Sequence, residues 1–295
     1  MNFNHLKLKK LICTCFSGSP ISHTELKDLS QFENVDKMPY RIEISEVRDS
    51  NGDGAEDLSD IELLLHSDNN ILTILDGDGD FRSEECIEFL KEADIVVTNP
   101  PFSLFRDYIA QLYKYKKRFI ILGNMNAITY KEIFPLIKDN KLWVGYGFNK
   151  SIIYKTPYPN LLEANRKFVI SKGKNPDEGY VKVPSICWFT NLDIDRLHTE
   201  LMLYKKYCPE SYPKFDNYDA INVDRVSDIP SDYFEWMGVP ITFLDKYSPD
   251  QFQIINGIGR YACIEDDYVN PPGTYGTDVN GKHNYFRILI RRISK

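Results

Sequence analysis

The sequence predicts an α/β protein with a mainly parallel sheet, followed by a less regular C-terminal region. Strand-like and helix-like segments alternate through the first half of the 295 residues, and this alternation is typical of βαβ units. Beyond residue 150 the chain is richer in Pro, Tyr and Asn, and its hydrophobic periodicity is weaker. We therefore predict two parts, residues 1–150 and residues 151–295.

Seven segments have the short apolar or alternating pattern of a β-strand. Six of them precede residue 150, namely 10–16, 40–47, 70–75, 94–98, 119–122 and 142–148. The seventh, 285–293, lies near the C-terminus. Segment 94–98 is rich in β-branched residues, so we expect it to be a buried parallel strand.

Helices are predicted between several of these strands. Ser83 has the character of a helix N-cap, with two acidic residues after it and apolar residues at helical spacing up to residue 93. A second helix is expected over 105–112, whose apolar residues share one face. The remaining candidates are 57–65 and 130–139, the latter interrupted near Pro135.

The composition is that of an ordinary globular protein and leaves several partners open. A net charge of −7 neither supports nor excludes nucleic acid, because Lys and Arg need only gather locally to meet phosphates. Six cysteines without a paired spacing favour reduced thiols and a cytoplasmic protein. The uncharged stretch 11–16 is too short for a signal peptide, and no segment approaches the roughly 20 apolar residues of a membrane span.

The sequence Asn99-Pro100-Pro101-Phe102 follows the predicted strand 94–98 and carries the clearest chemistry. An Asn at the carboxyl end of such a strand lies where α/β sheets bind ligands. Its side-chain carbonyl and the first Pro carbonyl can accept hydrogen bonds from an exocyclic amine and stabilise the positive charge that develops during transfer to nitrogen. The prolines stiffen the loop, and Phe102 offers a face for stacking a base rotated out of a duplex.

A second turn, Asp78-Gly79-Asp80-Phe81, follows another predicted strand. An acidic residue there can accept a hydrogen bond from the adenine amine of a bound cofactor. A solvated turn is the alternative for this short motif. Its place one βα unit before the Asn99 strand favours the cofactor interpretation.

Beyond these two motifs, the sequence resembles the EcoRI-type adenine-specific DNA methyltransferases. The resemblance extends over nearly the whole chain and includes GDGDFRSEECIEFLKEADIVVTNPPFSLFRDYIAQL, FIILGNMNAITYKEIFPLI, MGVPITFLDKYSPDQF and FRILIRR. It implies a Rossmann-like methyltransferase fold, S-adenosylmethionine as cofactor and double-stranded DNA as partner. The C-terminal region is then expected to recognise the DNA target.

The resemblance also assigns roles to residues. It implies catalysis by Asn99, Pro100, Pro101 and Phe102, and cofactor binding by Asp80 and Phe81. It suggests Phe148, with Tyr146 as the less favoured choice, as a second aromatic wall for the flipped base. Members of the family carry a further N-terminal stretch with the first cofactor motif, so we expect this chain to open at the second strand.

Three other groups of residues each allow two interpretations. Lys116 and Lys117 belong to a basic cluster that could contact DNA phosphates or be a solvated helix end. The arginines of 285–293 could contact DNA or protect a sheet edge. Residues 49–60 match the spacing of a calcium loop apart from a final Asp, but the strand-like segment before them favours no metal.

The sequence therefore predicts a site-specific DNA adenine-N6 methyltransferase. The alternative is a truncated, catalytically inactive, methyltransferase-like DNA-binding protein. A third hypothesis is methylation of another planar amine or amide, such as an RNA adenine or a protein Gln.

Overall fold

The computed structural model describes residues 3–17, 39–49, 52, 70–148, 150–156, 163–259 and 277–293. It divides into two compact units, residues 1–94 and 95–295, and each is considered by itself. Among the described residues, every helix is shorter or more polar than a bilayer-crossing helix has to be.

The first unit contains a three-stranded antiparallel sheet and one helix. Its strands are β1 (Leu11–Cys15), β2 (Tyr40–Ile44) and β3 (Asn70–Ile74), in that order across the sheet. These strands confirm three of the predicted ones, but β2 lies antiparallel between the other two. Because β1 and β3 run in the same direction, their carboxyl ends lie at the same edge.

Helix α2 (Glu84–Glu92) begins where the sequence predicts it. The Ser83 hydroxyl accepts a hydrogen bond from the Cys86 N–H at 3.2 Å, and two glutamates occupy the first turn. Both features stabilise the exposed N–H groups at a helix N-terminus.

The second unit begins with a four-stranded mixed sheet. Its order is β4 (Ile95–Thr98), β5 (Arg118–Asn124), β9 (Ile186–Thr190) and β6 (Trp143–Val144). Strands β4 and β5 are parallel, whereas β9 is antiparallel to both β5 and β6. Three strands therefore share one direction. The prediction of a mainly parallel sheet is nevertheless wrong for the described strands, whose only other parallel pair is β10 with β11.

Strand β9 is the antiparallel strand that makes this sheet mixed, and it lies beyond residue 150. Its side chains are mostly buried, and the Thr190 hydroxyl donates to the Phe119 carbonyl at 2.6 Å. The adjacent Asn191 accepts from the Phe119 N–H at 2.8 Å and donates to the Lys117 carbonyl at 2.9 Å. The sheet that carries the Asn99 motif thus continues across the boundary expected near residue 150.

Strand β4 is not the buried strand that its composition predicts. It lies at the end of the described sheet and pairs with β5 on one side. Accordingly, Ile95 is 42% exposed and Val97 is 66% exposed.

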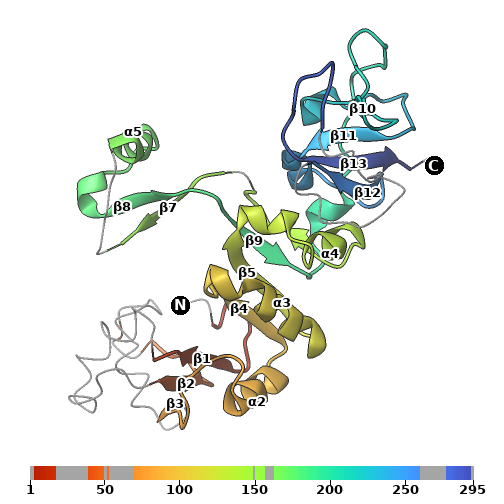
Figure 1. Cartoon of the computed structure of the whole chain (residues 1–295). Helices are drawn as coiled ribbons and strands as arrows, with labels where there is room; N and C mark the ends of the chain where they lie inside the picture. The colour runs from red at the N-terminus through yellow and green to blue at the C-terminus, as the bar shows by residue number, and fades with distance from the viewer. Residues whose placement is uncertain are drawn as a thin grey trace. The chain divides into compact units, whose positions relative to one another are not determined.

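Helix α3 (Phe105–Lys114) follows the short 3-10 helix η4 (Phe102–Leu104) and confirms the second predicted helix. Phe105, Ile109 and Leu112 are each at most 2% exposed. The spacing of these residues puts them on one helical face. Figure 1 shows α3 lying beside β4 and β5.

Helix α4 (Phe134–Lys138) is shorter than predicted. Pro135 lies in its first turn, where the missing N–H costs nothing, and so it starts the helix and does not interrupt it. The 3-10 helix η5 (Met125–Thr129) precedes α4.

A second sheet forms the C-terminal part. Its order is β10 (Ile221–Asn222), β11 (Met237–Pro240), β13 (Arg287–Arg292) and β12 (Phe252–Ile258), and β13 confirms the predicted C-terminal strand. Arg196 ties this part to the first sheet, because it donates to the Leu244 carbonyl at 2.9 Å and to the Val144 carbonyl. Burial lowers the pKa of the Arg196 guanidinium.

Between β6 and β9 the chain forms a further antiparallel pair with a helix. Strand β7 (Ile152–Lys155) pairs with β8 (Tyr180–Val183), and α5 (Glu163–Ser171) contacts β8 (Figure 1). The remaining 3-10 helices are η6 (Pro176–Glu178), η7 (Asp195–His198), η8 (Val226–Asp228) and η9 (Ile241–Asp245).

Candidate active site

The loop after β4 places its functional groups at the carboxyl edge of the first sheet. Thr98, the last residue of β4, is level with Ile121 in β5, and Asn99 follows immediately. Asn99 is exposed and Pro100 is buried. Phe102 is 39% exposed and begins η4. The buried proline fixes the loop while its neighbours remain accessible.

Two hydrogen-bond acceptors on consecutive residues of this loop accept no hydrogen bond from the described residues. Neither the Asn99 side chain nor the Pro100 carbonyl has a hydrogen-bond partner among them. The Pro101 carbonyl differs, because it accepts from the Leu104 N–H at 2.9 Å and so closes η4. The two open acceptors are the ones that the sequence motif predicts.

Packing beneath the loop depends on Gly123 of β5. A Cβ at position 123 would lie 2.5 Å from Phe105 Cε2, far inside van der Waals contact. The Phe105 ring also packs against Phe189 of β9, with ring centroids 5.0 Å apart. Because Phe105 starts α3, this fit determines where η4 and the preceding loop lie.

The second predicted motif lies in the first unit, at the edge where β1 and β3 end. The Ser17 N–H donates to the Asp78 carbonyl at 2.9 Å. Gly79 has φ +77°, and a Cβ there would lie 2.8 Å from the Cys15 carbonyl oxygen. A glycine is therefore required both by the left-handed backbone and by the close approach to β1.

Asp80 is held by Arg82. Its Oδ1 accepts from the Arg82 backbone N–H and Nε, each at 2.8 Å, and its Oδ2 accepts from Arg82 Nη2 at 2.7 Å. These bonds keep the pKa of the Asp80 carboxyl below its usual range. The Arg82 guanidinium also lies over the Phe81 ring, 5.2 Å from its centroid.

The turn still fits one further donor. A carboxylate has about four lone-pair positions, and Arg82 uses three of those on Asp80. One position on Oδ2 remains for an amine such as N6 of a cofactor adenine.

Comparison with known proteins decides the family. The family model described as adenine-specific methyltransferase EcoRI matches residues 1–293. The chain belongs to this family. It is 41% identical to the Type II methyltransferase M.EcoRI of Escherichia coli, over 99% of this chain and 79% of that relative.

Two further relatives of this methyltransferase come from mycoplasmas. M.MpnI of Mycoplasma pneumoniae is 39% identical over 74% of this chain and 70% of its own length. M.MgeORF184P of Mycoplasma genitalium is 40% identical over 75% of this chain and 71% of its own length. No solved structure matches the chain.

A protein of this family needs a methyl donor. The aromatic residues near the sheet can also be judged by whether a flipped base could stack on them. Phe148, our first choice for the second wall around a flipped base, is 2% exposed and belongs to the core. A base cannot stack on a ring without an open face. Tyr146 is 63% exposed, so the less favoured choice is the accessible one.

Lys116 and Lys117 lie at the other edge of the sheet from Asn99. They connect α3 to β5, and the first residue of β5, Arg118, is level with Ile95 at the start of β4. Asn99 follows the end of β4. The structure therefore does not bring these two lysines together with the motif.

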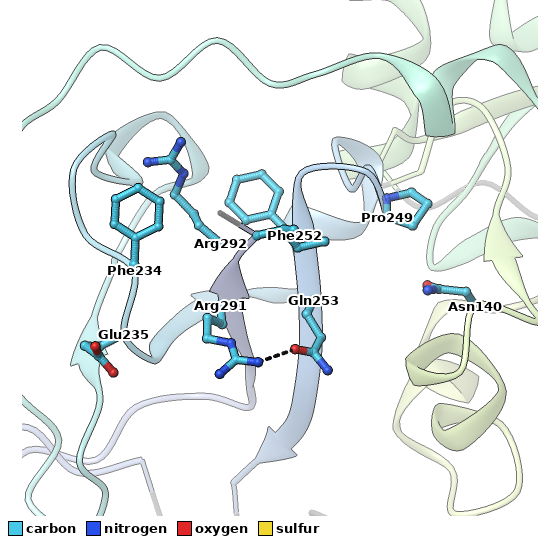
Figure 2. A pocket seen from close by; sticks show the side chains of 9 residues that line it. Asn140, Phe234, Glu235, Pro249, Phe252, Gln253, Arg291 and Arg292 are labelled. Atoms are coloured by element: carbon cyan, nitrogen blue, oxygen red, sulfur yellow. Dashed lines mark hydrogen bonds between the residues drawn. The ribbon is translucent and has the colours of Figure 1, made fainter. Parts of the chain in front are cut away.

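The C-terminal arginines are engaged with their own sheet. Arg287 donates to Asn222 at 3.3 Å, and Arg292 stacks on Phe234 at 4.6 Å from the ring centroid. Arg291 donates to Gln253 Oε1 at 2.8 Å, as Figure 2 shows.

Arg291 and Arg292 line a cavity of about 570 Å³ together with Asn140 and Gln253. Asn140 precedes β6, at the amino edge of the first sheet. This cavity is therefore not the place where the Asn99 loop would act. The calcium-like loop lies almost entirely outside the described residues, and those that are described contain no cluster of three metal-binding side chains.

Proposed function

We propose that this chain transfers a methyl group from S-adenosylmethionine to N6 of adenine at a specific site in double-stranded DNA. The observation that supports this function is the pair of open acceptors, Asn99 Oδ1 and the Pro100 carbonyl, at the carboxyl end of β4. Since the relatives are named Type II methyltransferases, we extend the proposal to a role in restriction and modification.

The chemistry of the loop follows from the weak nucleophilicity of adenine N6, whose lone pair is delocalised into the ring. When Asn99 and Pro100 accept hydrogen bonds from the two N–H groups, they hold the amine and favour a tetrahedral nitrogen. They then stabilise the positive charge that develops as the N–C bond forms. Pro101 keeps the loop stiff, and Phe102 stacks on the flipped base.

Asp80 and Phe81 would hold the adenine end of the cofactor, through the remaining Oδ2 position and the ring. S-adenosylmethionine supplies an electrophilic methyl group on a sulfonium. A Rossmann-like fold belongs to the same proposal. The three strands that share a direction in the β4–β5–β9–β6 sheet support such a fold.

Residues 1–150 would then provide catalysis and residues 151–295 would recognise the DNA target. The second sheet, β10 to β13, gives the latter region a core of its own. A cytoplasmic location belongs to the same proposal, because duplex DNA is the substrate.

The test is to incubate the protein with labelled S-adenosylmethionine and, in parallel, with duplex DNA, RNA and denatured protein. Digestion of the DNA should yield labelled N6-methyladenine. Label in RNA or in protein glutamine alone would replace the proposed substrate. If no label is transferred, equilibrium binding of the labelled cofactor distinguishes a wrong substrate from an inactive, DNA-binding relative, which would not bind it.

A further inference from the structure

The segment between β6 and β9 concentrates positive charge in an acidic chain. We call residues 150–183 the basic arm. The arm has seven Lys and Arg residues against three Asp and Glu, a net charge of +4, whereas the whole chain has −7. Local gathering of this kind is what a DNA-binding protein with an acidic overall charge requires.

The basic arm is an ordered structure in its described parts, 150–156 and 163–183. Strand β7 pairs with β8 through Lys155 and Tyr180 at one end and through Ile152 and Val183 at the other. Val169 of α5 is fully buried, so the helix is anchored to this pair.

Lysines flank two aromatic rings on the arm. The Phe168 ring lies under Lys182, at 4.5 Å from the ring centroid, and under Lys172, at 5.7 Å. The Tyr180 ring lies under Lys174 at 5.1 Å and Lys155 at 5.9 Å. Each ring therefore holds two lysine ammonium groups near its face and supports their side-chain stems.

Among the described residues, the lysines of the basic arm lack the carboxylate partners that other lysines have. Arg166 pairs with Asp177 at 2.9 Å, but none of the six lysines forms an ion pair with a described residue. In contrast, Lys10 lies 2.7 Å from Glu43 and Lys214 lies 2.6 Å from Asp219. The charge of the arm is therefore available to an external anion.

Both ends of the arm leave the first sheet at the edge where Asn99 lies. On one side Pro184 and Ser185 connect β8 to β9, whose first residue, Ile186, is level with Asn124 at the carboxyl end of β5. On the other side β6 runs toward the same edge, because β5 and β6 are both antiparallel to β9. The Met125 N–H, just after β5, donates to the Ser185 carbonyl at 2.8 Å.

We infer that the basic arm binds the phosphate backbone of duplex DNA beside the catalytic edge, with Lys155, Lys172, Lys174 and Lys182 as contacts. This inference rests on the proposed function, which makes DNA the substrate. It replaces Lys116 and Lys117, which lie at the opposite edge. Contacts with phosphate position a duplex without reading its sequence, so the arm increases affinity for all DNA and leaves target choice to other residues.

The experiment replaces these four lysines with glutamine and measures duplex DNA binding at several salt concentrations, together with kcat and KM. Each phosphate contact contributes about 0.9 to the slope of log K against log salt. We expect the slope to decrease in magnitude by about 3 to 4, KM for DNA to rise at least tenfold near physiological salt, and kcat at saturating DNA to change less than threefold.

Two matched variants accompany it. Glutamine at Lys114, Arg118, Lys138 and Lys141 removes the same charge from the amino edge, and we expect the parental slope. Arginine at the four arm positions keeps the charge, and it should also keep the slope. If the fourfold glutamine variant has a lower melting temperature than the parent, the double variant Lys155→Gln with Lys174→Gln replaces it. We expect this double variant to lower the magnitude of the slope by about 1.8.

The parental slope in the glutamine variant of the arm, or an equal loss in the amino-edge variant, would overturn the inference. Unchanged binding to DNA would also mean that the arm meets a different acidic partner. Binding is measured independently of methyl transfer. Failure of the proposed function would instead appear as absent N6-methyladenine with the parent protein.

Discussion

Two turns of this methyltransferase follow a β-strand and carry polar groups, but they use those groups differently. In the loop after β4, Asn99 and Pro100 leave two acceptors without a partner among the described residues. In the turn after β3, three of the four lone-pair positions of Asp80 are occupied by Arg82. One turn is open to a ligand at two atoms, and the other is open at one.

The difference matches the two tasks that we propose. Acceptors that must respond to charge developing on a nitrogen need to be free and already in place. A carboxylate that recognises a cofactor needs only one free position, and its other bonds hold it ionised and oriented. The comparison therefore predicts a large effect on kcat at Asn99 and a smaller effect, on cofactor binding, at Asp80.

The largest effect is expected for Asn99→Ala. Loss of one preorganised partner of a developing charge costs about 10²–10³ in kcat, and the exposed position should leave the fold intact. The measurement is N6-methyladenine formation at saturating DNA and cofactor, with a melting curve for the variant.

Asn126→Ala is the matched control, because Asn126 is also an exposed asparagine just beyond a strand of the same sheet. We expect its kcat to stay within threefold of the parent value. Equal activity of Asn99→Ala and the parent would remove Asn99 from the catalytic step.

The loop and its flanking elements could be predicted because their signals are local. A β-branched run, two prolines and apolar residues at helical spacing suffice for β4, the loop and α3, and the structure confirms the order of all three. Ser83 and its two glutamates likewise predict the start of α2.

Pairing between distant segments could not be predicted in the same way. Nothing near Ile186 indicates that β9 enters the first sheet antiparallel to β5, since its partner lies more than sixty residues earlier. The sequence predicts a DNA contact at Lys116 and Lys117, which are consecutive. The lysines of the arm lie in β7, in β8 and just after α5, and only the fold gathers them around Phe168 and Tyr180.

A smaller effect, on stability, is expected for Gly123→Ala. The added Cβ would lie 2.5 Å from the Phe105 ring, and overpacking of this kind costs about 1–3 kcal/mol in the free energy of unfolding. Because Phe105 positions the Asn99 loop, kcat should fall as well. Urea unfolding and the methylation assay measure the two effects.

Gly77→Ala is the control for the Gly123→Ala substitution. A Cβ at position 77 meets no atom within 4 Å, and Gly77 lies in the turn after β3. We expect unchanged or slightly higher stability. Equal destabilisation by the two substitutions would contradict the role of the Gly123–Phe105 contact.

For Asp80→Ala we expect weaker cofactor binding with little change in kcat at saturation. Loss of a hydrogen bond to a charged acceptor costs about 1.5–3 kcal/mol, which corresponds to roughly 10- to 150-fold in Kd. Calorimetric titration with S-adenosylmethionine gives the value. Asp76→Ala removes an exposed acid from the same turn region and should leave Kd unchanged; a similar loss in both variants would indicate general repulsion or unfolding of the turn and not a specific bond.

The smallest effect concerns the Asp80–Arg82 pair itself. Arg82 holds the pKa of Asp80 below its usual range in the folded protein. A depressed folded-state pKa stabilises the protein above the unfolded value of about 3.9, and this contribution is lost as the pH falls through the folded pKa.

Arg82→Ala should therefore raise the pKa of Asp80 toward its ordinary value, which a carboxyl NMR titration would show. The Arg82 side chain is 55% exposed, so solvent screening limits the stability loss at pH 7 to about 1 kcal/mol or less. The difference in stability between variant and parent should shrink as the pH falls through the folded-state pKa of Asp80. An unchanged pKa of Asp80 in Arg82→Ala would mean that Arg82 does not bind this carboxylate. The acceptors of Asp80 would then be as open as those of the Asn99 loop, and the contrast between the two turns would disappear.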